Sequence, residues 1–211
     1  MIGALRLMPK VPTCYYLSGS KKDMSIPAQQ HLTSLEYLEW ERCQESKHEY
    51  FNGDILAMTG ASRKHNLITA NLLAGLHTRL RNKPCEIYSS DMRVKVSSTG
   101  LYTYPDIVVV CGEPQFEDAI LDTLLNPILI VEVLSHSTEN YDRGKKFGHY
   151  RRLPSLQEYL LVAQDQCQVE HYVRQPDEAW LLREYKHPED SLQFIALNCE
   201  LILAEIYERV I

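Results

Sequence analysis

The sequence lacks closely spaced cysteines. Its six cysteines include no C-x-x-C pair, whereas the cysteine ligands of structural zinc usually come in such pairs. They are scattered along the chain at Cys14, Cys43, Cys85, Cys111, Cys167 and Cys199. A zinc site built from them is therefore not expected. Because nothing in the sequence indicates export, we expect a cytoplasmic protein with reduced cysteines.

Long apolar runs and an excess of positive charge are also missing. No run approaches the ~18 apolar residues of a membrane-spanning helix. Pro9 and Pro12 interrupt the N-terminal stretch, which also carries Arg6 and Lys10, so it does not fit the apolar part of a signal peptide. The net charge is −6 and the pI is near 5.8. This negative net charge counts against a protein that binds nucleic acid non-specifically over its whole surface. A local basic strip is still compatible with it.

The composition that remains is that of one globular domain. The chain has 211 residues, of which 45% are hydrophobic and 24% charged. Residues 1–30 lack periodicity and are rich in proline, so we predict a flexible N-terminal arm there and one domain over residues 31–211. Met24 opens a more ordinary start, and the hypothesis that the natural product begins there stays open.

Periodicity along the domain predicts alternating helices and strands. Helices are predicted at 33–40, 62–81, 140–153 and 201–210. Strands are predicted at 50–51, 55–58, 86–88, 92–96, 107–111, 128–134, 159–163, 168–173, 180–185 and 192–195. The first two strands should form a hairpin through Asn52-Gly53. We therefore expect an α/β fold with one mixed sheet flanked by helices.

Two acidic residues stand at the predicted central strands. Asp106 directly precedes one apolar run, and Glu132 lies inside the next. A carboxylate inside a central strand loses several kcal/mol of hydration unless it is paired or bound to metal. For Glu132, a buried ion pair with Arg93 or Lys95 and a role as metal ligand both stay open. Asp106 by itself is typical of a turn residue before a strand.

Together these two acids fit a magnesium site, because Mg²⁺ prefers one or two carboxylates with water and substrate phosphate as further ligands. The predicted helix after the second strand places Asp142, Lys146 and Tyr150 on one face. We expect Lys146 to reach between the two acids, where its charge orients a water and offsets a phosphate. Lys145 fits an ordinary surface residue.

A further acid, Glu49, precedes the hairpin. It is a candidate to border the same site, and pairing across the strands of the hairpin explains it equally well.

These residues form a pattern that resembles a known superfamily. Pro105-Asp106 before one strand and Glu132 in the next are similar to the PD-(D/E)XK, or restriction-endonuclease-like, nucleases. The wider set resembles the Uma family of proposed endonucleases, domain of unknown function 820, over about Thr33 to Val173. That set comprises Glu49-Tyr50-x-x-Gly53, His65, Tyr104-Pro105-Asp106, Val131-Glu132-Val133-Leu134-Ser135, Tyr141-Asp142-Arg143-Gly144-x-Lys146, Tyr150 and Glu158-Tyr159.

The resemblance implies a restriction-endonuclease-like mixed β-sheet flanked by helices and assigns roles to single residues. The lysine that the superfamily motif places two residues after the acid would fall at Leu134, and in similar proteins it comes from the following helix, where Lys146 stands. Glu49 corresponds to the glutamate that joins the site from the N-terminal part. His65 and Asp91 match recurrent family positions without a settled role.

The function predicted from these features is DNA cleavage by a Mg²⁺-dependent endonuclease, with Mn²⁺ as a substitute. Asp106 and Glu132 are expected to hold the metal, Lys146 to orient the attacking water, and Glu49 to assist. A homodimer is expected because a double-strand cut needs two sites. A binding or regulatory protein that keeps the fold without turnover, and a hydrolase of smaller phosphoesters, stay open as alternatives.

Overall fold

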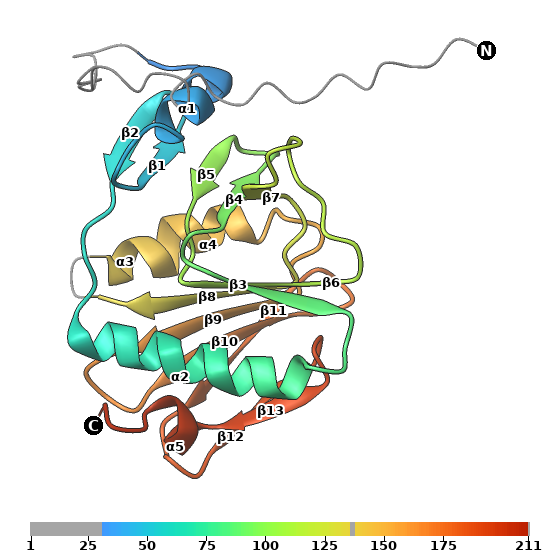
Figure 1. The fold of residues 1–211 in the computed structure, drawn as a ribbon. Coiled ribbons are helices and arrows are strands. Elements are labelled where there is room, and N and C mark those ends of the chain that lie inside the picture. The colour runs from blue at the N-terminus through green and yellow to red at the C-terminus, as the bar shows by residue number, and fades with distance from the viewer. Residues whose placement is uncertain (1–30, 136–137, 211) are drawn as a thin grey trace.

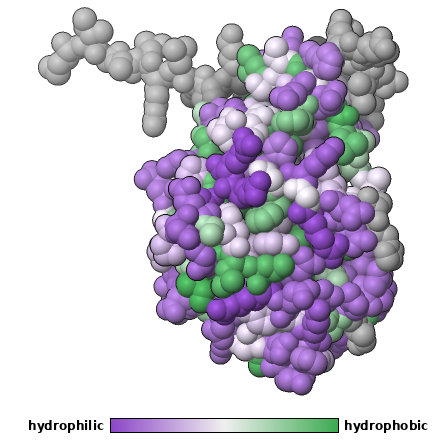
Figure 2. Space-filling view, turned by 180° about the vertical axis from the view of Figure 1, so that it is seen from behind, coloured by the Kyte–Doolittle hydropathy of each residue, from purple (hydrophilic) through white to green (hydrophobic). Residues whose placement is uncertain are grey.

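The computed structural model describes residues 31–135 and 138–210, and the predicted arm over residues 1–30 lies outside them. Figure 1 shows a central sheet with α2 (Arg63–Leu80) across one face and a second sheet on the other side, together with the helix of α3 (Glu139–Tyr141) and α4 (Phe147–Tyr150). The surface seen from behind is mainly hydrophilic, with smaller hydrophobic areas (Figure 2). Over the described ranges, no helix is both long enough and apolar enough to cross a bilayer.

The central sheet has six strands in the order β11-β10-β9-β8-β6-β3, with β8 and β9 parallel and the other neighbours antiparallel. The strands are β3 (Cys85–Ser89), β6 (Ile107–Cys111), β8 (Leu129–Leu134), β9 (Glu158–Ala163), β10 (Val169–Arg174) and β11 (Trp180–Tyr185). Alternate residues of β6 and β8 pack toward α2 on one face and toward α4 on the other. Both faces are covered, which explains why these two strands are continuous apolar runs, as predicted.

The remaining strands form two further sheets. A five-stranded sheet has the order β2-β1-β5-β4-β7, and a two-stranded one pairs β12 with β13. These strands are β1 (His48–Phe51), β2 (Asp54–Ala57), β4 (Arg93–Val96), β5 (Leu101–Thr103), β7 (Thr123–Leu124), β12 (Ser191–Phe194) and β13 (Cys199–Ile202). The expectation of a single sheet is therefore wrong in this respect.

One end of the five-stranded sheet packs with α1 around a group of aromatic side chains. The ring of Tyr37, from α1 (Ser34–Glu41), stacks on that of Tyr50 in β1 at a centroid distance of 4.8 Å. Tyr102 of β5 closes the group, 5.8 Å from Tyr50. All three side chains are buried, and they form a small core with α1, whereas β4 and β7 pack into the core between this sheet and the central sheet.

Local signals account for the predicted starts and turns. Thr33 caps α1 in a capping box with Glu36, and the Ser62 hydroxyl caps α2. Asn52 and Gly53 both have positive φ, of 50° and 94°, which is the backbone that a tight hairpin requires. The first helices and the hairpin are thus confirmed.

The predicted helix at 201–210 is wrong over most of its length. Leu201 and Ile202 belong to β13, and only α5 (Leu203–Ile206) is helical. Pairing of β13 with β12 sets Leu201 opposite Leu192, and both side chains are buried against the core of α2. This tertiary packing outweighs the helical spacing of the local sequence.

The expectation of uniformly reduced cysteines is wrong at one pair. Cys85 of β3 and Cys111 of β6 form a disulfide. The antiparallel register sets the two residues directly opposite each other, with their Cα atoms 4.0 Å apart.

Substitution of Leu72 tests the core between α2 and the central sheet. Leu72 is fully buried, so Leu72→Ala should lower the free energy of unfolding by about 2–5 kcal/mol through lost burial and a cavity. The matched control is Leu35→Ala on α1, where 65% of the side chain is exposed and a change within about 0.5 kcal/mol is expected. Urea denaturation measures both, and equal losses would contradict this packing.

Candidate active site

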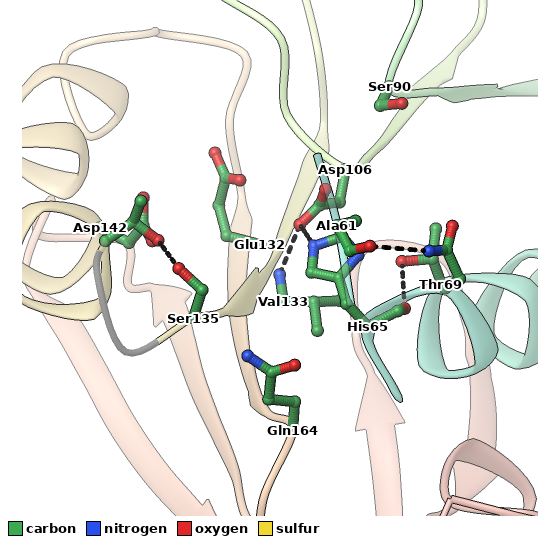
Figure 3. A network of polar contacts seen from close by, with 12 residues as sticks. Ala61, His65, Thr69, Ser90, Asp106, Glu132, Val133, Ser135, Asp142 and Gln164 are labelled. Atoms are coloured by element: carbon green, nitrogen blue, oxygen red, sulfur yellow. Dashed lines mark hydrogen bonds and ion pairs between the residues drawn. The ribbon is translucent and has the colours of Figure 1, made fainter. Parts of the chain in front are cut away.

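The candidate site lies where the last residues of β8 meet the residue before β6. Ile107 pairs with Val131 in the antiparallel register, so one step further Asp106 stands opposite Glu132. Figure 3 shows Asp106, Glu132 and Asp142 around the end of β8, with the first turn of α2 beside Asp106. The register therefore brings Asp106, which directly precedes β6, beside Glu132 of β8.

Glu132 is held by two donors on one oxygen. Lys146 Nζ donates to Oε1 at 3.2 Å, and the Tyr150 hydroxyl donates to the same atom at 2.8 Å. Only 4% of Glu132 is exposed. Loss of hydration raises the pKa of Glu132 to about 8; Lys146 opposes this shift, and the charges of Asp142, Asp106 and Glu49 add to it. Glu132 is thus a buried acid, and the negative charges of three nearby acids disfavour its ionised form.

Lys146 is the cation that these acids share. Its Nζ lies 3.0 Å from Glu49 Oε1, 3.2 Å from Glu132 Oε1 and 3.5 Å from Asp142 Oδ1. Burial disfavours the ammonium, but the three carboxylates outweigh it and raise the pKa of Lys146 well above its usual value. Lys146 is therefore protonated in this arrangement.

These contacts correct one expectation about Lys146. The sequence suggested that it reaches between Asp106 and Glu132. Among the described residues, its carboxylate contacts run instead to Glu132, Glu49 and Asp142.

Asp142 and Lys146 are the two ends of a π-helical turn, and both side chains are buried. The turn η2 (Asp142–Lys146) joins α3 to α4, and its two end residues are buried while Lys145 is exposed. Such wide turns recur at functional sites because they redirect side chains. Burial raises the pKa of Asp142, and Lys146 opposes the shift. The pattern of Asp142, Lys146 and Tyr150 in the sequence carried this signal, but Asp142 was not proposed as a site residue.

Glu49 enters the site from the five-stranded sheet. The Thr103 hydroxyl of β5 donates a hydrogen bond to Glu49 Oε1, the oxygen that also contacts Lys146. Glu49 therefore contacts both the neighbouring strand, through Thr103, and the site, through Lys146. Thr103 also lies 3.3 Å from the Tyr150 hydroxyl, which links the second sheet to α4. Neither Thr103 nor Tyr150 was assigned a role from the sequence.

Asp106 has different partners from those of the other acids. Its Oδ2 accepts a hydrogen bond from the Val133 backbone N–H at 2.7 Å and lies 3.1 Å from His65 Nε2 (Figure 3). His65 thus joins the site. Asp91 does not join the acid cluster: it pairs with Lys47 at 3.0 Å, and its side chain is 87% exposed.

The alternative ion pairs considered for Glu132 are not formed. Arg93 Nη2 binds Asp122 at 2.8 Å, and Lys95 pairs with Glu117. The basic residue beside Glu132 is Lys146.

The donor set fits a divalent cation. Glu49, Glu132 and Asp142 contact the ammonium of Lys146, and the charge of Asp106 is close enough to act on Glu132. Carboxylate oxygens are the ligands that Mg²⁺ selects, and one or two protein carboxylates suffice because waters complete the shell. Over residues 31–135 and 138–210, no three acidic, histidine or cysteine side chains converge as ligands of one ion. A magnesium ion here would therefore take no more than two of these side chains as ligands, for which Asp106 and Glu132 are the candidates, and water would supply the rest.

Comparison with known proteins identifies relatives along most of the chain. The family model "Uma2: Putative restriction endonuclease" matches residues 35–204. Two uncharacterized proteins of Synechocystis sp. (strain ATCC 27184 / PCC 6803 / Kazusa) are similar. Protein sll1609 is 40% identical over 171 residues, which are 81% of this chain and 97% of the relative. Protein slr1290 is 39% identical over 176 residues, which are 83% of this chain and 91% of the relative.

A solved structure has the same fold. It is the crystal structure of a "putative nuclease belonging to DUF820" from Anabaena variabilis ATCC 29413. The likeness has a TM-score of 0.71 and covers 85% of this chain and 99% of that chain at 17% sequence identity. The mixed α/β fold expected from the sequence is confirmed.

Two substitutions test the charge balance around Lys146. Lys146→Met leaves buried carboxylates without their counter-charge and should lower the free energy of unfolding by about 3–5 kcal/mol. Asp142→Asn removes one of three acids on the same ammonium and should cost less than about 1 kcal/mol, because Glu49, the acid nearest to the ammonium, still neutralises it. Urea denaturation at neutral pH measures both. A larger loss for Asp142→Asn would show that the three acids do not share one cation.

Proposed function

We propose that this chain, which belongs to the Uma2 family of "putative restriction endonucleases", hydrolyses phosphodiester bonds in DNA as a divalent-metal-dependent endonuclease. The observation that carries the proposal is the cluster of buried carboxyl groups around Lys146, with Asp106, the residue before β6, beside Glu132 of β8. Buried acids in this number cost stability and contribute nothing to packing. Their value lies in binding a cation and a reacting phosphate.

Each side chain has a role in this proposal. Asp106 and Glu132 would hold Mg²⁺ or Mn²⁺, which when bound polarises a phosphoryl oxygen and acidifies water. Tyr150 fixes the orientation of Glu132 through its hydrogen bond to Oε1. Glu49 holds Lys146 from the opposite sheet and assists the site.

Lys146 acts in its charged form. The carboxylates around it keep the ammonium protonated, as the raised pKa of Lys146 indicates. An ammonium donates hydrogen bonds and offers a compact positive charge. We therefore assign it to orient the attacking water and to offset charge on the phosphate, rather than to remove a proton.

A non-catalytic binding or regulatory protein is the second candidate. The net charge of −6 favours it, because DNA-binding proteins usually gain affinity from an excess of positive charge. Against it stands the retention of Glu132 in the central strand, where an apolar residue would cost less to bury.

A homodimer belongs to the proposal as well. One site cuts one strand, so a double-strand break needs two sites, and a two-fold pair of chains would provide them.

Metal binding can be tested apart from cleavage. Mg²⁺ or Mn²⁺ should raise the thermal midpoint, because an ion that binds only the folded state stabilises it by roughly 2.7 kcal/mol at a hundred times its dissociation constant. Asp106→Asn should remove this gain without destabilising the metal-free protein, since it removes one of the mutually repelling acids. Differential scanning calorimetry measures the shift. The same shift in both proteins would place the ion elsewhere.

Cleavage distinguishes an enzyme from a binding protein. With Mg²⁺ or Mn²⁺, the wild type should nick or cut supercoiled plasmid, and EDTA should stop it. Lys146→Ala should reduce the rate by about 10² to 10³ but keep metal binding, because the lysine acts on water and phosphate. Each variant is assayed below its own unfolding temperature.

The matched control is Lys145→Ala, whose side chain is exposed on the same π-helical turn. It should cut like the wild type. Cleavage that neither substitution changes would indicate a contaminating nuclease, and no cleavage across varied DNA and metals would favour the binding protein.

A further inference from the structure

His65 is a polar side chain in the site that the proposed chemistry does not use. It lies in the first turn of α2, where its backbone N–H donates to the Ser62 hydroxyl at 3.1 Å. Its carbonyl accepts a hydrogen bond from the Thr69 hydroxyl at 2.9 Å. The backbone of His65 is therefore held at both its N–H and its carbonyl. Its imidazole extends from this turn to Asp106, and only 16% of the side chain is exposed.

The contact with His65 falls on one particular oxygen of Asp106. Oδ2 lies 3.1 Å from His65 Nε2 and accepts the Val133 N–H at 2.7 Å. Over the described part of the chain, the side-chain hydrogen bonds of Asp106 all go to Oδ2. Oδ1 is thereby left for a ligand from outside the chain. Because a carboxylate oxygen accepts, Nε2 of His65 must carry the proton that is shared.

Two donors from different elements restrict the carboxylate more than one does. The Val133 N–H alone fixes the position of Oδ2 but lets the group swing about that contact. His65 adds a second direction, from α2, so the plane of the carboxylate is set by two rigid elements. Groups that hydrogen-bond to a metal-binding carboxylate typically change metal affinity by about 10-fold to 100-fold.

We propose that His65 is a positioning residue, which fixes the Asp106 carboxylate so that Oδ1 is presented to a divalent cation. This inference rests on the proposed function in taking Asp106 as a metal ligand. It adds the residue that orients that ligand and the atom, Nε2–H, through which it acts. His65 itself does not touch the metal or the substrate.

Metal affinity without DNA is the decisive measurement. Isothermal titration of Mn²⁺ should show His65→Leu binding about 10-fold or more weakly than the wild type, because leucine fills the space without a donor. His65→Gln should stay within about threefold of the wild type, since its amide nitrogen reaches as far as Nε2 and donates in the same way. His77→Leu, exposed on the same helix, is the matched control and should bind like the wild type.

A purely structural role would give a different result. If His65 only ties α2 to the sheet, His65→Leu will lower the free energy of unfolding without weakening Mn²⁺ binding, and the inference is overturned. It is equally overturned if His65→Gln binds as weakly as His65→Leu, or if the wild type binds no Mn²⁺.

The outcome is distinguishable from failure of the proposed function. A wild type that binds Mn²⁺ with the expected ranking of variants but cuts no plasmid would leave the role of His65 intact and overturn the nuclease proposal. If the wild type cuts plasmid but binds Mn²⁺ no more tightly than the His65→Leu, His65→Gln and His77→Leu variants, the nuclease proposal stands and the role of His65 is overturned.

Discussion

The ammonium of Lys146 joins three acidic side chains that come from different elements of the fold. Glu49 comes from the five-stranded sheet, Glu132 from the central sheet, and Asp142 from the same helical segment as the lysine. Each of these acids would be costly to bury by itself. The ion pairs with Lys146 offset the free-energy cost of burying these carboxylates. The same ion pairs hold the five-stranded sheet and the helical segment of Lys146 close to β8. The acid cluster thus depends on this contact.

The central sheet provides the rigid frame for this contact. β6 and β8 are buried on both faces, so the register that opposes Asp106 to Glu132 cannot slip without exposing apolar side chains. The acids lie at the end of this paired region, where an oxygen can face outward without breaking a ladder of hydrogen bonds. A site that needs fixed geometry is therefore attached to a sheet that is packed on both faces.

Features set by local chemistry could be predicted from the sequence. The hairpin at Asn52-Gly53, the cap at Ser62 and the two buried strands follow from turn residues and from apolar runs. The nearness of Asp106 to Glu132 followed from their places at neighbouring strands, and their common face stays a prediction. The partners of Lys146 did not, because its contact with Glu49 joins residues far apart in the chain through two sheets that looked like one. The pairing of His65 with Asp106 was missed for the same reason. Metal binding by Asp106 and Glu132 stays a prediction.

The parallel pairing of β8 with β9 has a consequence for how such a protein can change over time. Parallel neighbours cannot be joined by a tight turn and need a crossover of a dozen or more residues. Here the crossover is the segment that contains η2 and α4, so the same stretch that closes the topology carries Lys146. Evolution cannot delete this segment without disconnecting the sheet. A lineage that abandons the chemistry must therefore lose it through point substitutions, and its descendants will keep the helix after the lysine has gone.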